Sequence, residues 1–460
     1  MFFERVYDKS LAQASYVIGC QAGGIAAVID PKRDVDTYLK IAEENNFTIT
    51  KILETHIHAD FLSGSRELAA LTGAEMYLSD MGGKDWQYEF PHNKTIQGDH
   101  IALGNLDFEV LYTPGHTPES LSFLLTDKAA TSVPVMVFTG DFVFVGDVGR
   151  PDLLEQAAGI KGSQEIGAAQ LFDSLQQFQN NQAFIQIWPG HGAGSACGKS
   201  LGAVPSSTVG YEKIRNWAFQ QLGDEATFTK TLLEDQPEPP QYFAKMKQLN
   251  KIERKLLTKV PEIKHLSINA FMNKVSGKMP LIDTRTPEDF AKGYLKGSMN
   301  IENNNSIATW MGWFMDYCAP FVLIAEPNEL DNLSRKLMRI GLDDVFGYIS
   351  PNELKNAEGM NLMSSTPIIK EEVQDKINNH NAQVIDVRGA SEFKKGHIDG
   401  AKNLFVGNLN HNLDQISKDR PVIVHCLSGS RSAIAYSLLK ANGFENVFNY
   451  AGGWQDWQNS

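Results

Sequence analysis

The sequence predicts a multidomain α/β protein, in which one layered α/β domain is followed by two copies of a smaller α/β domain. The chain has 460 residues, which is more than one hydrophobic core usually organises, so two to four domains are expected. Its first half contains strand-like apolar runs that each end in a polar cluster. Its second half contains an internal repeat, which predicts duplicated domains.

The first half alternates between short apolar runs and helical patterns. SYVIGC and GIAAVID, separated by Gln-Ala-Gly-Gly, predict an opening pair of strands over residues 15–31, and a helical pattern follows over residues 35–44. Further strand candidates are ITKILET, FEVLYT, SLSFLL, VPVMVFTG and AFIQIW. Because each of these runs ends in polar residues, we expect the chemistry to lie on loops at the sheet edges.

An acidic, proline-rich stretch marks the end of this domain. Residues 234–240 read EDQPEPP, and they follow a predicted helical segment over residues 209–233. Prolines and acidic residues at this density are typical of linkers. The first domain is therefore predicted over residues 1–240.

The remainder of the chain contains two copies of one domain. LIDTRTPEDFAKGYLKGSMNI aligns with VIDVRGASEFKKGHIDGAKNL at an offset of about a hundred residues. The alignment pairs Asp283 with Asp386, and each copy continues into an apolar strand and then a helix. We therefore predict two small α/β domains with largely parallel sheets, over residues 262–358 and 364–460.

Composition limits the expected partners and location. A formal net charge of -13 and a pI near 5.4 argue against a broad nucleic-acid surface, because phosphate binding needs clustered Lys and Arg. No run of about 18 or more apolar residues occurs, so no membrane span is expected. The start at Met1 lacks the features of a signal peptide, and the four cysteines are too far apart to form a disulfide framework. We expect a cytoplasmic homo-oligomer with free thiols.

Six potential metal-binding side chains occur at the predicted strand ends. THIHADF supplies three of them, and TPGHT, FTGDF and WPGHG each supply one more, which gives His56, His58, Asp60, His116, Asp141 and His191. Neutral imidazoles and carboxylates bind a divalent ion at about 2.0 to 2.2 Å. One HxH alone is weak evidence, but the series in this order predicts a metal centre.

These motifs resemble those of the metallo-β-lactamase superfamily, and residues 1–240 resemble its persulfide dioxygenase branch in particular. The resemblance implies a metallo-β-lactamase-like αββα sandwich. The superfamily often reads HxHxDH, whereas Phe61 stands here in place of the last histidine. A second metal ion would lose one of its ligands, so a mononuclear centre is expected.

By this resemblance the metal is one iron(II) per chain, held by His56, His116 and Asp141. Three ligands on one face leave open positions where a thiolate-type substrate and O2 can both bind. The side chains then expected to orient ligands, to hydrogen-bond substrate or to belong to a second site are His58, Asp60 and His191. The alternative is a zinc centre in which His58 is also a ligand.

Two further residues are candidates for substrate binding or sulfur relay. Arg150 in GDVGRPDLL could bind the carboxylate or phosphate of a thiol carrier, or it could form a structural ion pair. Cys197, in the Gly-rich stretch HGAGSACGKS after His191, could accept or relay sulfur, or be an ordinary loop cysteine. The sequence leaves both pairs of alternatives open.

The second copy contains a loop that suits a reactive thiolate. VIVHCLSGSRSAIAYSLL places Cys426 directly after a strand, and the loop that leads into the next helix is Leu427, Ser428, Gly429, Ser430 and Arg431. Inward backbone amides and a helix N-terminus stabilise a thiolate or persulfide anion. The CxxGxR pattern, with DVR and GH…GA upstream, resembles the rhodanese sulfurtransferases.

This loop favours sulfur over phosphate, because protein phosphatases of related architecture have one more residue between cysteine and arginine. Cys426 is therefore the expected nucleophile. Arg431 is expected to hold an oxyanion such as sulfite, or else to brace the loop. In the first copy FVLIAEPNELDN aligns Ala325 or its neighbour with Cys426, so that copy is predicted to be an inactive rhodanese-like domain.

The order of these domains is similar to that of bacterial persulfide dioxygenase-rhodanese fusions. The resemblance implies that a low-molecular-weight thiol persulfide is oxidised by O2 to sulfite, and that Cys426 then passes sulfur to sulfite to give thiosulfate, which detoxifies sulfide. The sequence also permits a zinc thioester hydrolase of glyoxalase II type fused to a sulfurtransferase, or a persulfide sensor or relay protein. It does not identify the thiol that carries the sulfur.

Overall fold

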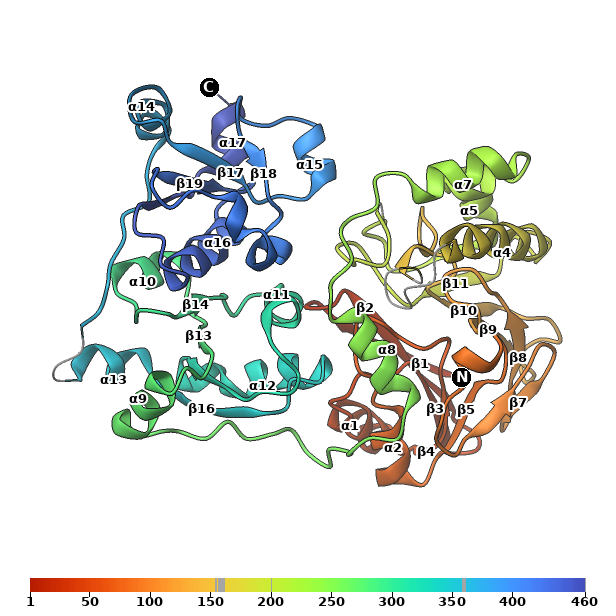
Figure 1. Ribbon diagram of the computed structural model, residues 1–460. Helices are drawn as coiled ribbons and strands as arrows, with labels where there is room; N and C mark the ends of the chain where they lie inside the picture. Colours follow the sequence, from red (N-terminus) through yellow and green to blue (C-terminus); the bar gives the residue numbers. More distant parts are fainter. Residues whose placement is uncertain (154, 156–161, 200, 358–360, 460) are drawn as a thin grey trace. The chain divides into compact units, whose positions relative to one another are not determined.

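The computed structural model describes residues 1–153, 155, 162–199, 201–357 and 361–459. The chain forms two compact units, of which the first contains Met1–Val260 with Met338–Gly341 and the second contains Pro261–Leu337 with Leu342–Ser460 (Figure 1). The first unit extends past the proline-rich stretch and includes helix α8 (Phe243–Lys251).

Two six-stranded sheets form the framework of the first unit. In spatial order, the first sheet contains β1 (Phe2–Asp8), β2 (Gln13–Cys20), β3 (Ile25–Ile29), β4 (Thr48–Leu53), β5 (Glu75–Ser79) and β6 (Asn93–Thr95). The second contains β12 (Ser207–Thr208), β11 (Gln186–Pro189), β10 (Met136–Gly140), β9 (Leu121–Asp127), β8 (Leu106–Tyr112) and β7 (His100–Leu103). Every predicted strand of this region is present, and each is rich in residues that favour extended backbone.

Helices cover the outer faces of the two sheets (Figure 1). The core between the sheets contains Tyr16, Phe108 and Phe138, which are fully or almost fully buried. The helices of this unit are α1 (Asp36–Glu44), α2 (Ser65–Thr72), α4 (Ser163–Phe178), α5 (Val209–Arg215), α6 (Trp217–Gln220), α7 (Glu225–Leu233) and α8, with the short 3-10 helix η1 (Lys84–Trp86). Helices α1 and α2 pack on the first sheet, and α4 and α7 pack on the second. The predicted αββα sandwich is confirmed.

The second unit contains two four-stranded parallel sheets with the same topology. The first copy contains α9 (Ile268–Ser276), β13 (Leu281–Asp283), α10 (Pro287–Lys292), β14 (Met299–Asn300), α11 (Ile307–Phe314), β15 (Phe321–Ile324), η2 (Pro327–Glu329), α12 (Leu330–Arg339), β16 (Val345–Ile349) and α13 (Pro351–Asn356). The second contains α14 (Lys370–His380), β17 (Gln383–Asp386), α15 (Ala390–Lys394), β18 (Lys402–Asn403), η3 (Val406–His411), η4 (Leu413–Gln415), β19 (Val422–His425), α16 (Ser430–Ala441), β20 (Val447–Tyr450) and α17 (Gly453–Gln458). The strand orders are β14-β13-β15-β16 and β18-β17-β19-β20.

The aligned residues of the repeat make the same contacts in both copies. In the first, Arg285 forms an ion pair with Asp283 and donates to the carbonyl of Gly293; in the second, Arg388 pairs with Asp386 and donates to Gly396. The repeat therefore reflects one buried scaffold that is used twice.

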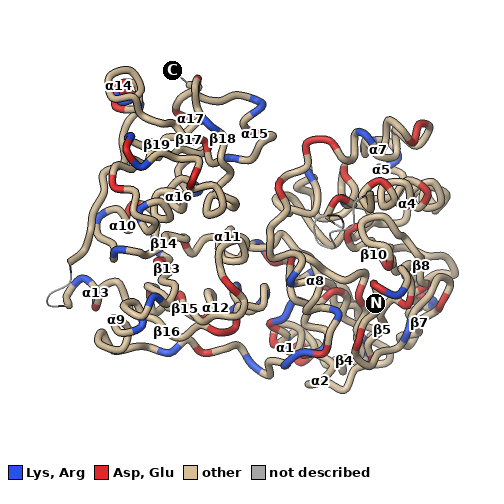
Figure 2. Tube along the Cα trace, viewed as in Figure 1, with Lys and Arg blue, Asp and Glu red and all other residues tan. Residues whose placement is uncertain are grey.

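Acidic and basic residues are interspersed along both units (Figure 2). This distribution agrees with the modest excess of acidic residues in the sequence. Among the described residues, no helix is both long enough and apolar enough to cross a bilayer.

Candidate functional site

The predicted metal ligands come together at one edge of the sandwich. His56 follows β4, His116 follows β8 and Asp141 directly follows β10, and each side chain is almost completely buried. Their potential ligand atoms all lie within 4.8 Å of one another. Asp141 Oδ2 lies 3.9 Å from His56 Nε2 and 3.6 Å from His116 Nε2.

Both histidines direct Nε2 toward this point, because Nδ1 of each is already hydrogen-bonded. His116 Nδ1 donates to the carbonyl of Arg150 over 3.0 Å, and His56 Nδ1 lies 2.9 Å from Thr55 Oγ1. His56 Nε2 and Asp141 Oδ2 are buried and have no hydrogen-bond partner among the described residues. Leaving such atoms unpaired is costly, and a divalent metal would satisfy them. The donor set therefore fits a metal ion.

His191 binds Oδ1 of Asp141, the carboxylate oxygen that does not face His56 and His116. Its Nδ1 lies 2.7 Å from Asp141 Oδ1, and its Nε2 lies 2.9 Å from Asp60 Oδ2. Burial disfavours the charged ring, but the Asp141 and Asp60 carboxylates outweigh it and raise the pKa of His191 to about 10. Both ring nitrogens are thus engaged by carboxylates, so His191 and Asp60 support Asp141 in this arrangement.

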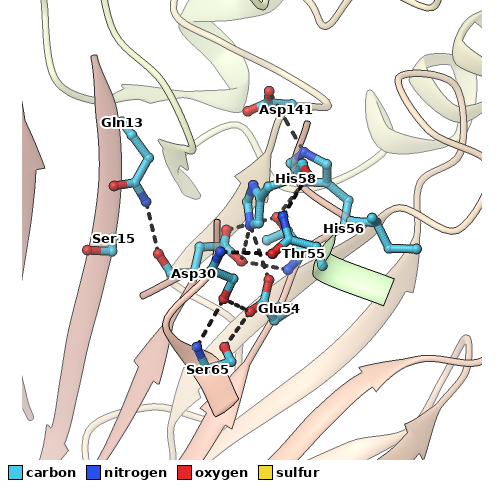
Figure 3. Close-up of polar contacts among 12 residues, drawn as sticks. Gln13, Ser15, Asp30, Glu54, Thr55, His56, His58, Ser65 and Asp141 are labelled. Atoms are coloured by element: carbon cyan, nitrogen blue, oxygen red, sulfur yellow. Dashed lines mark hydrogen bonds and ion pairs between the residues drawn. The ribbon is translucent and has the colours of Figure 1, made fainter. Parts of the chain in front are cut away.

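His58 belongs to a second cluster with two buried acids, although its ring centroid lies 4.2 Å from that of His56. Its Nε2 lies 3.3 Å from Asp30 Oδ1 and 3.2 Å from Glu54 Oε2 (Figure 3). Burial lowers the pKa of His58, but these two acids more than compensate and bring it well above the usual value. Nε2 therefore faces carboxylates, and Phe61 packs on the ring with centroids 4.3 Å apart.

Arg150 and Cys197 are both buried near Asp141. The Arg150 guanidinium donates twice to Asp152 and once to the carbonyl of Ala196, and it is 1% exposed. Of the two sequence alternatives, these contacts are those of the structural ion pair, and three of the five N–H donors of the guanidinium are used in them. Cys197 Sγ clusters with Asp60 and His191, and burial raises the pKa of its thiol well above the ordinary value, which keeps it protonated.

Sequence reasoning missed Asp30, Thr55, Glu54 and Glu119. Asp30 and Thr55 each follow a strand, but one polar residue at a strand end carries little signal. Glu119 in GHTPES accepts a hydrogen bond from the backbone nitrogen of Ile57 over 2.7 Å, and this bond joins the loop of His56 to the loop of His116. Only the TPGHT motif could have drawn attention to it.

The buried Glu119 predicts a dependence of stability on pH. Burial raises its pKa from 4.5 to about 7, against the lowering effect of the Ile57 hydrogen bond. Between pH 4.5 and about 7 the folded state binds more protons than the unfolded state. The contribution of Glu119 to the free energy of unfolding is therefore fully present below pH 4.5, the pKa in the unfolded state, and is lost as the pH rises through about 7, the pKa in the folded state.

Glu119→Gln keeps an acceptor for Ile57 and cannot ionise. We expect the metal-free variant to exceed the wild type in unfolding free energy by on the order of 2 kcal/mol above pH 7, and by much less at pH 5. Urea unfolding at the two pH values measures this. A difference that does not change with pH would contradict the assignment.

The predicted nucleophile lies at the base of its loop. Cys426 directly follows β19 and is 1% exposed, and the backbone nitrogen of Gly429 donates to Sγ over 3.1 Å. Gly429 has φ +101°, a conformation that favours glycine, and a Cβ there would lie 2.9 Å from the carbonyl oxygen of Ala451. Helix α16 begins at Ser430, so its N-terminus adds positive potential beside the sulfur.

Arg431 occupies this loop but is engaged by an acid. Both terminal nitrogens of its guanidinium donate to the two carboxylate oxygens of Glu392. Burial lowers the pKa of Arg431, but the Glu392 contact reverses this and raises it. Of the two roles expected for Arg431, loop bracing is the one visible in these contacts.

The first copy has no thiol at the corresponding position. Strand β15 pairs in parallel with β13 as β19 pairs with β17, and Ala325 follows β15 where Cys426 follows β19. Cys318 is exposed and lies before β15 begins. A persulfide cannot form at Ala325.

Comparison with known proteins agrees with this architecture. Residues 10–191 match the model of the metallo-beta-lactamase superfamily, and residues 370–460 match that of the rhodanese-like domain. A crystal structure of a metallo-beta-lactamase from Staphylococcus aureus subsp. aureus COL is 42% identical, with a TM-score of 0.69, and the match covers 76% of this chain and 99% of that one.

Two curated relatives match part of the chain. A hydroxyacylglutathione hydrolase of Rhodospirillum rubrum is 32% identical over 176 residues, which are 38% of this chain and 60% of that protein. The mitochondrial persulfide dioxygenase ETHE1 of Bos taurus is 28% identical over 166 residues, 34% of this chain and 59% of that protein. The match spans less than two thirds of either relative. The chain belongs to the metallo-β-lactamase superfamily and carries a rhodanese-like domain at its C-terminal end.

Proposed function

We propose that the chain is a non-haem iron persulfide dioxygenase coupled to sulfur transfer. The observation that carries the proposal is the buried set of His56, His116 and Asp141, whose ligand atoms converge while two of them have no partner. Two histidines and one carboxylate on one face are typical of iron(II) sites that activate O2. Similarity to the ETHE1 persulfide dioxygenase supports the same chemistry.

The residues of this chain prepare the site for that ion. Burial lowers the pKa of both His56 and His116, so both rings are neutral and can offer a lone pair. His191 and Asp60 hold Asp141 with Oδ2 directed toward the two rings. When bound, iron(II) would supply open positions for the terminal sulfur of the persulfide and for O2.

The first reaction is balanced as RSSH + O2 + H2O giving RSH, SO3²⁻ and two protons. Its sulfite is the acceptor for the second site. There the Cys426 thiolate attacks the outer sulfur of another persulfide, the S–S bond breaks, and RS⁻ leaves with its electron pair. Sulfite then attacks the outer sulfur of the Cys426 persulfide, which releases thiosulfate and restores the thiolate. No external oxidant is needed for this transfer.

Linking both sites in one chain favours this sequence. The Cys426 persulfide is linked to the site that makes sulfite, so it meets sulfite at a higher effective concentration than a persulfide on a separate protein would. Sulfite made by one site would thus be consumed by the other before it accumulates. We place the activity in the detoxification of reactive sulfur.

A zinc thioester hydrolase of glyoxalase II type is the second candidate for the first unit. The hydroxyacylglutathione hydrolase of Rhodospirillum rubrum, at 32% identity, favours it. Phe61 disfavours it, because that position often supplies a histidine to a second metal in this superfamily. The two candidates differ in metal, in co-substrate and in product.

Elemental analysis and an oxygen electrode distinguish the two candidates. We expect about one iron per chain after anaerobic purification, and O2 uptake that matches sulfite formation when a thiol persulfide is added. Glutathione persulfide, coenzyme A persulfide and cysteine persulfide are compared to identify the carrier. Zinc alone, with thioester hydrolysis that proceeds equally without O2, would refute the proposal.

A further inference from the structure

Asp30 anchors the hydrogen bonds around the candidate metal centre, although no sequence motif marks it (Figure 3). It directly follows β3, is 2% exposed and has φ +50°, which is unfavourable for a residue with a side chain. Its backbone is fixed on both sides: its nitrogen donates to the Leu53 carbonyl, and its carbonyl accepts from Gln13 Nε2.

The Asp30 carboxylate fixes the direction of a short chain of hydrogen bonds. Oδ1 accepts from the backbone nitrogen of Thr55 over 2.7 Å, and Oδ2 accepts from the Thr55 hydroxyl over 2.8 Å. Because a carboxylate can only accept, the single hydroxyl hydrogen of Thr55 is used in this bond. Thr55 Oγ1 must therefore accept at its 2.9 Å contact with His56 Nδ1. His56 then carries its hydrogen on Nδ1 and keeps the Nε2 lone pair free.

We propose that Asp30 is a positioning residue that sets the tautomer of His56 through the Thr55 hydroxyl, so that Nε2 is ready to bind metal. The inference rests on the proposed role of His56 as a ligand. Ring nitrogens of metal-bound histidines are commonly fixed by a partner on the opposite nitrogen. Here the partner is a hydroxyl, and the carboxylate behind it determines which way that hydroxyl points.

Another role for Asp30 must be separated from this one. Asp30 Oδ1 also lies 3.3 Å from His58 Nε2, so a variant could act through His58 instead. Glu54 supplies a matched control, since its Oε2 lies 3.2 Å from the same nitrogen and no hydrogen bond joins Glu54 to Thr55 among the described residues. If Asp30 acts through His58, metal binding should weaken in Glu54→Gln as well as in Asp30→Asn.

Asp30→Asn tests the direction of the chain. The amide oxygen still accepts from the Thr55 backbone, but the amide nitrogen now donates to the Thr55 hydroxyl oxygen. The hydroxyl hydrogen thereby loses its acceptor at residue 30, and His56 Nδ1 is the remaining contact of this hydroxyl among the described residues. We therefore expect the hydroxyl to donate to Nδ1 and the ring hydrogen to move to Nε2, which blocks the lone pair needed for metal. Thr55→Val removes the hydroxyl but keeps the shape of the side chain. That shape matters because the side chain packs closely against Gly140, on which an added Cβ would lie 2.6 Å from Thr55 Cβ. Thr55→Ser keeps the hydroxyl.

The first measurement needs no metal. Long-range ¹H–¹⁵N spectra of the full-length, metal-free protein, with ¹⁵N-labelled histidine and His56→Gln for assignment, report the tautomer of His56 directly. We expect the hydrogen on Nδ1 in the wild type, in Thr55→Ser and in Glu54→Gln, and on Nε2 in Asp30→Asn. A wild-type ring protonated on Nε2 would overturn the inference.

The second measurement is anaerobic titration with Fe(II) alone and with Zn(II) alone against a competing chelator. We expect Asp30→Asn to weaken binding about 10- to 100-fold, with Thr55→Ser and Glu54→Gln close to the wild type. In the Thr55→Val background, Asp30→Asn should change affinity less than about twofold, because the connecting hydroxyl is already gone. Equal losses in Asp30→Asn and Glu54→Gln, or an undiminished loss in the double variant, would overturn the inference.

These results separate the two proposals. If the protein takes up zinc and consumes no O2 but the tautomer and the double-variant pattern hold, the proposed dioxygenase fails and the role of Asp30 stands. If O2 is consumed but the tautomer does not respond to Asp30, the dioxygenase stands and the role of Asp30 fails.

Discussion

Cys426→Ser is expected to abolish sulfur transfer while O2 consumption continues. A serine hydroxyl cannot form the persulfide that carries the outer sulfur, so thiosulfate formation should fall by about a thousandfold or more. Sulfite should then accumulate in an amount close to the O2 consumed. Separation of sulfite from thiosulfate by bimane labelling and chromatography measures both products in one reaction.

The matched control is Cys318→Ser, because Cys318 is exposed and belongs to the copy without a catalytic thiol. It should leave both products unchanged. Gly429→Ala adds an independent check, since a Cβ at this φ of +101° would displace the amide that donates to Cys426 Sγ. Thiosulfate formation at the normal rate by Cys426→Ser would show that sulfur leaves by another route.

The fold was predictable because its signals are local or repeated. The strands that precede the candidate ligands are short runs rich in apolar residues, and each ligand follows the end of its strand within a few residues, so the sheet edge could be inferred from the sequence. The duplicated domains were predictable from aligned polar residues such as Asp283 and Asp386. Each of these aspartates forms an ion pair with the arginine two residues later, which explains why both residues occur in each copy.

The partners of the candidate ligands were not predictable, because they depend on contacts between distant segments. Asp30 meets Thr55 only after β3 and β4 pair, and Glu119 meets Ile57 only when the two sheets pack together. Arg150 shows the reverse problem. The sequence permits a free guanidinium, but Asp152, two residues away, accepts two hydrogen bonds from it inside the fold. The residue types of the site were therefore predictable, whereas the hydrogen bonds that already occupy its groups were not.

His116→Ala is expected to remove the metal and the O2-dependent reaction together. His116 supplies one of three converging ligand atoms, and the Arg150 carbonyl fixes its ring with Nε2 directed toward the other two. We expect iron content well below one per chain and a fall of about a thousandfold or more in persulfide-dependent O2 uptake. Sulfur transfer by Cys426 should remain, because that nucleophile belongs to a different compact unit.

His100→Ala is the matched control for this loss. His100 is a histidine of the same unit that pairs with Asp107 at a largely exposed position, so its removal tests the loss of an imidazole without the loss of a ligand. Metal content and O2 uptake should both be retained. Because a metal that joins three loops also stabilises them, adding Fe(II) should raise the thermal midpoint of His100→Ala but not that of His116→Ala. Retention of one iron per chain by His116→Ala would mean that another residue of the chain completes the centre.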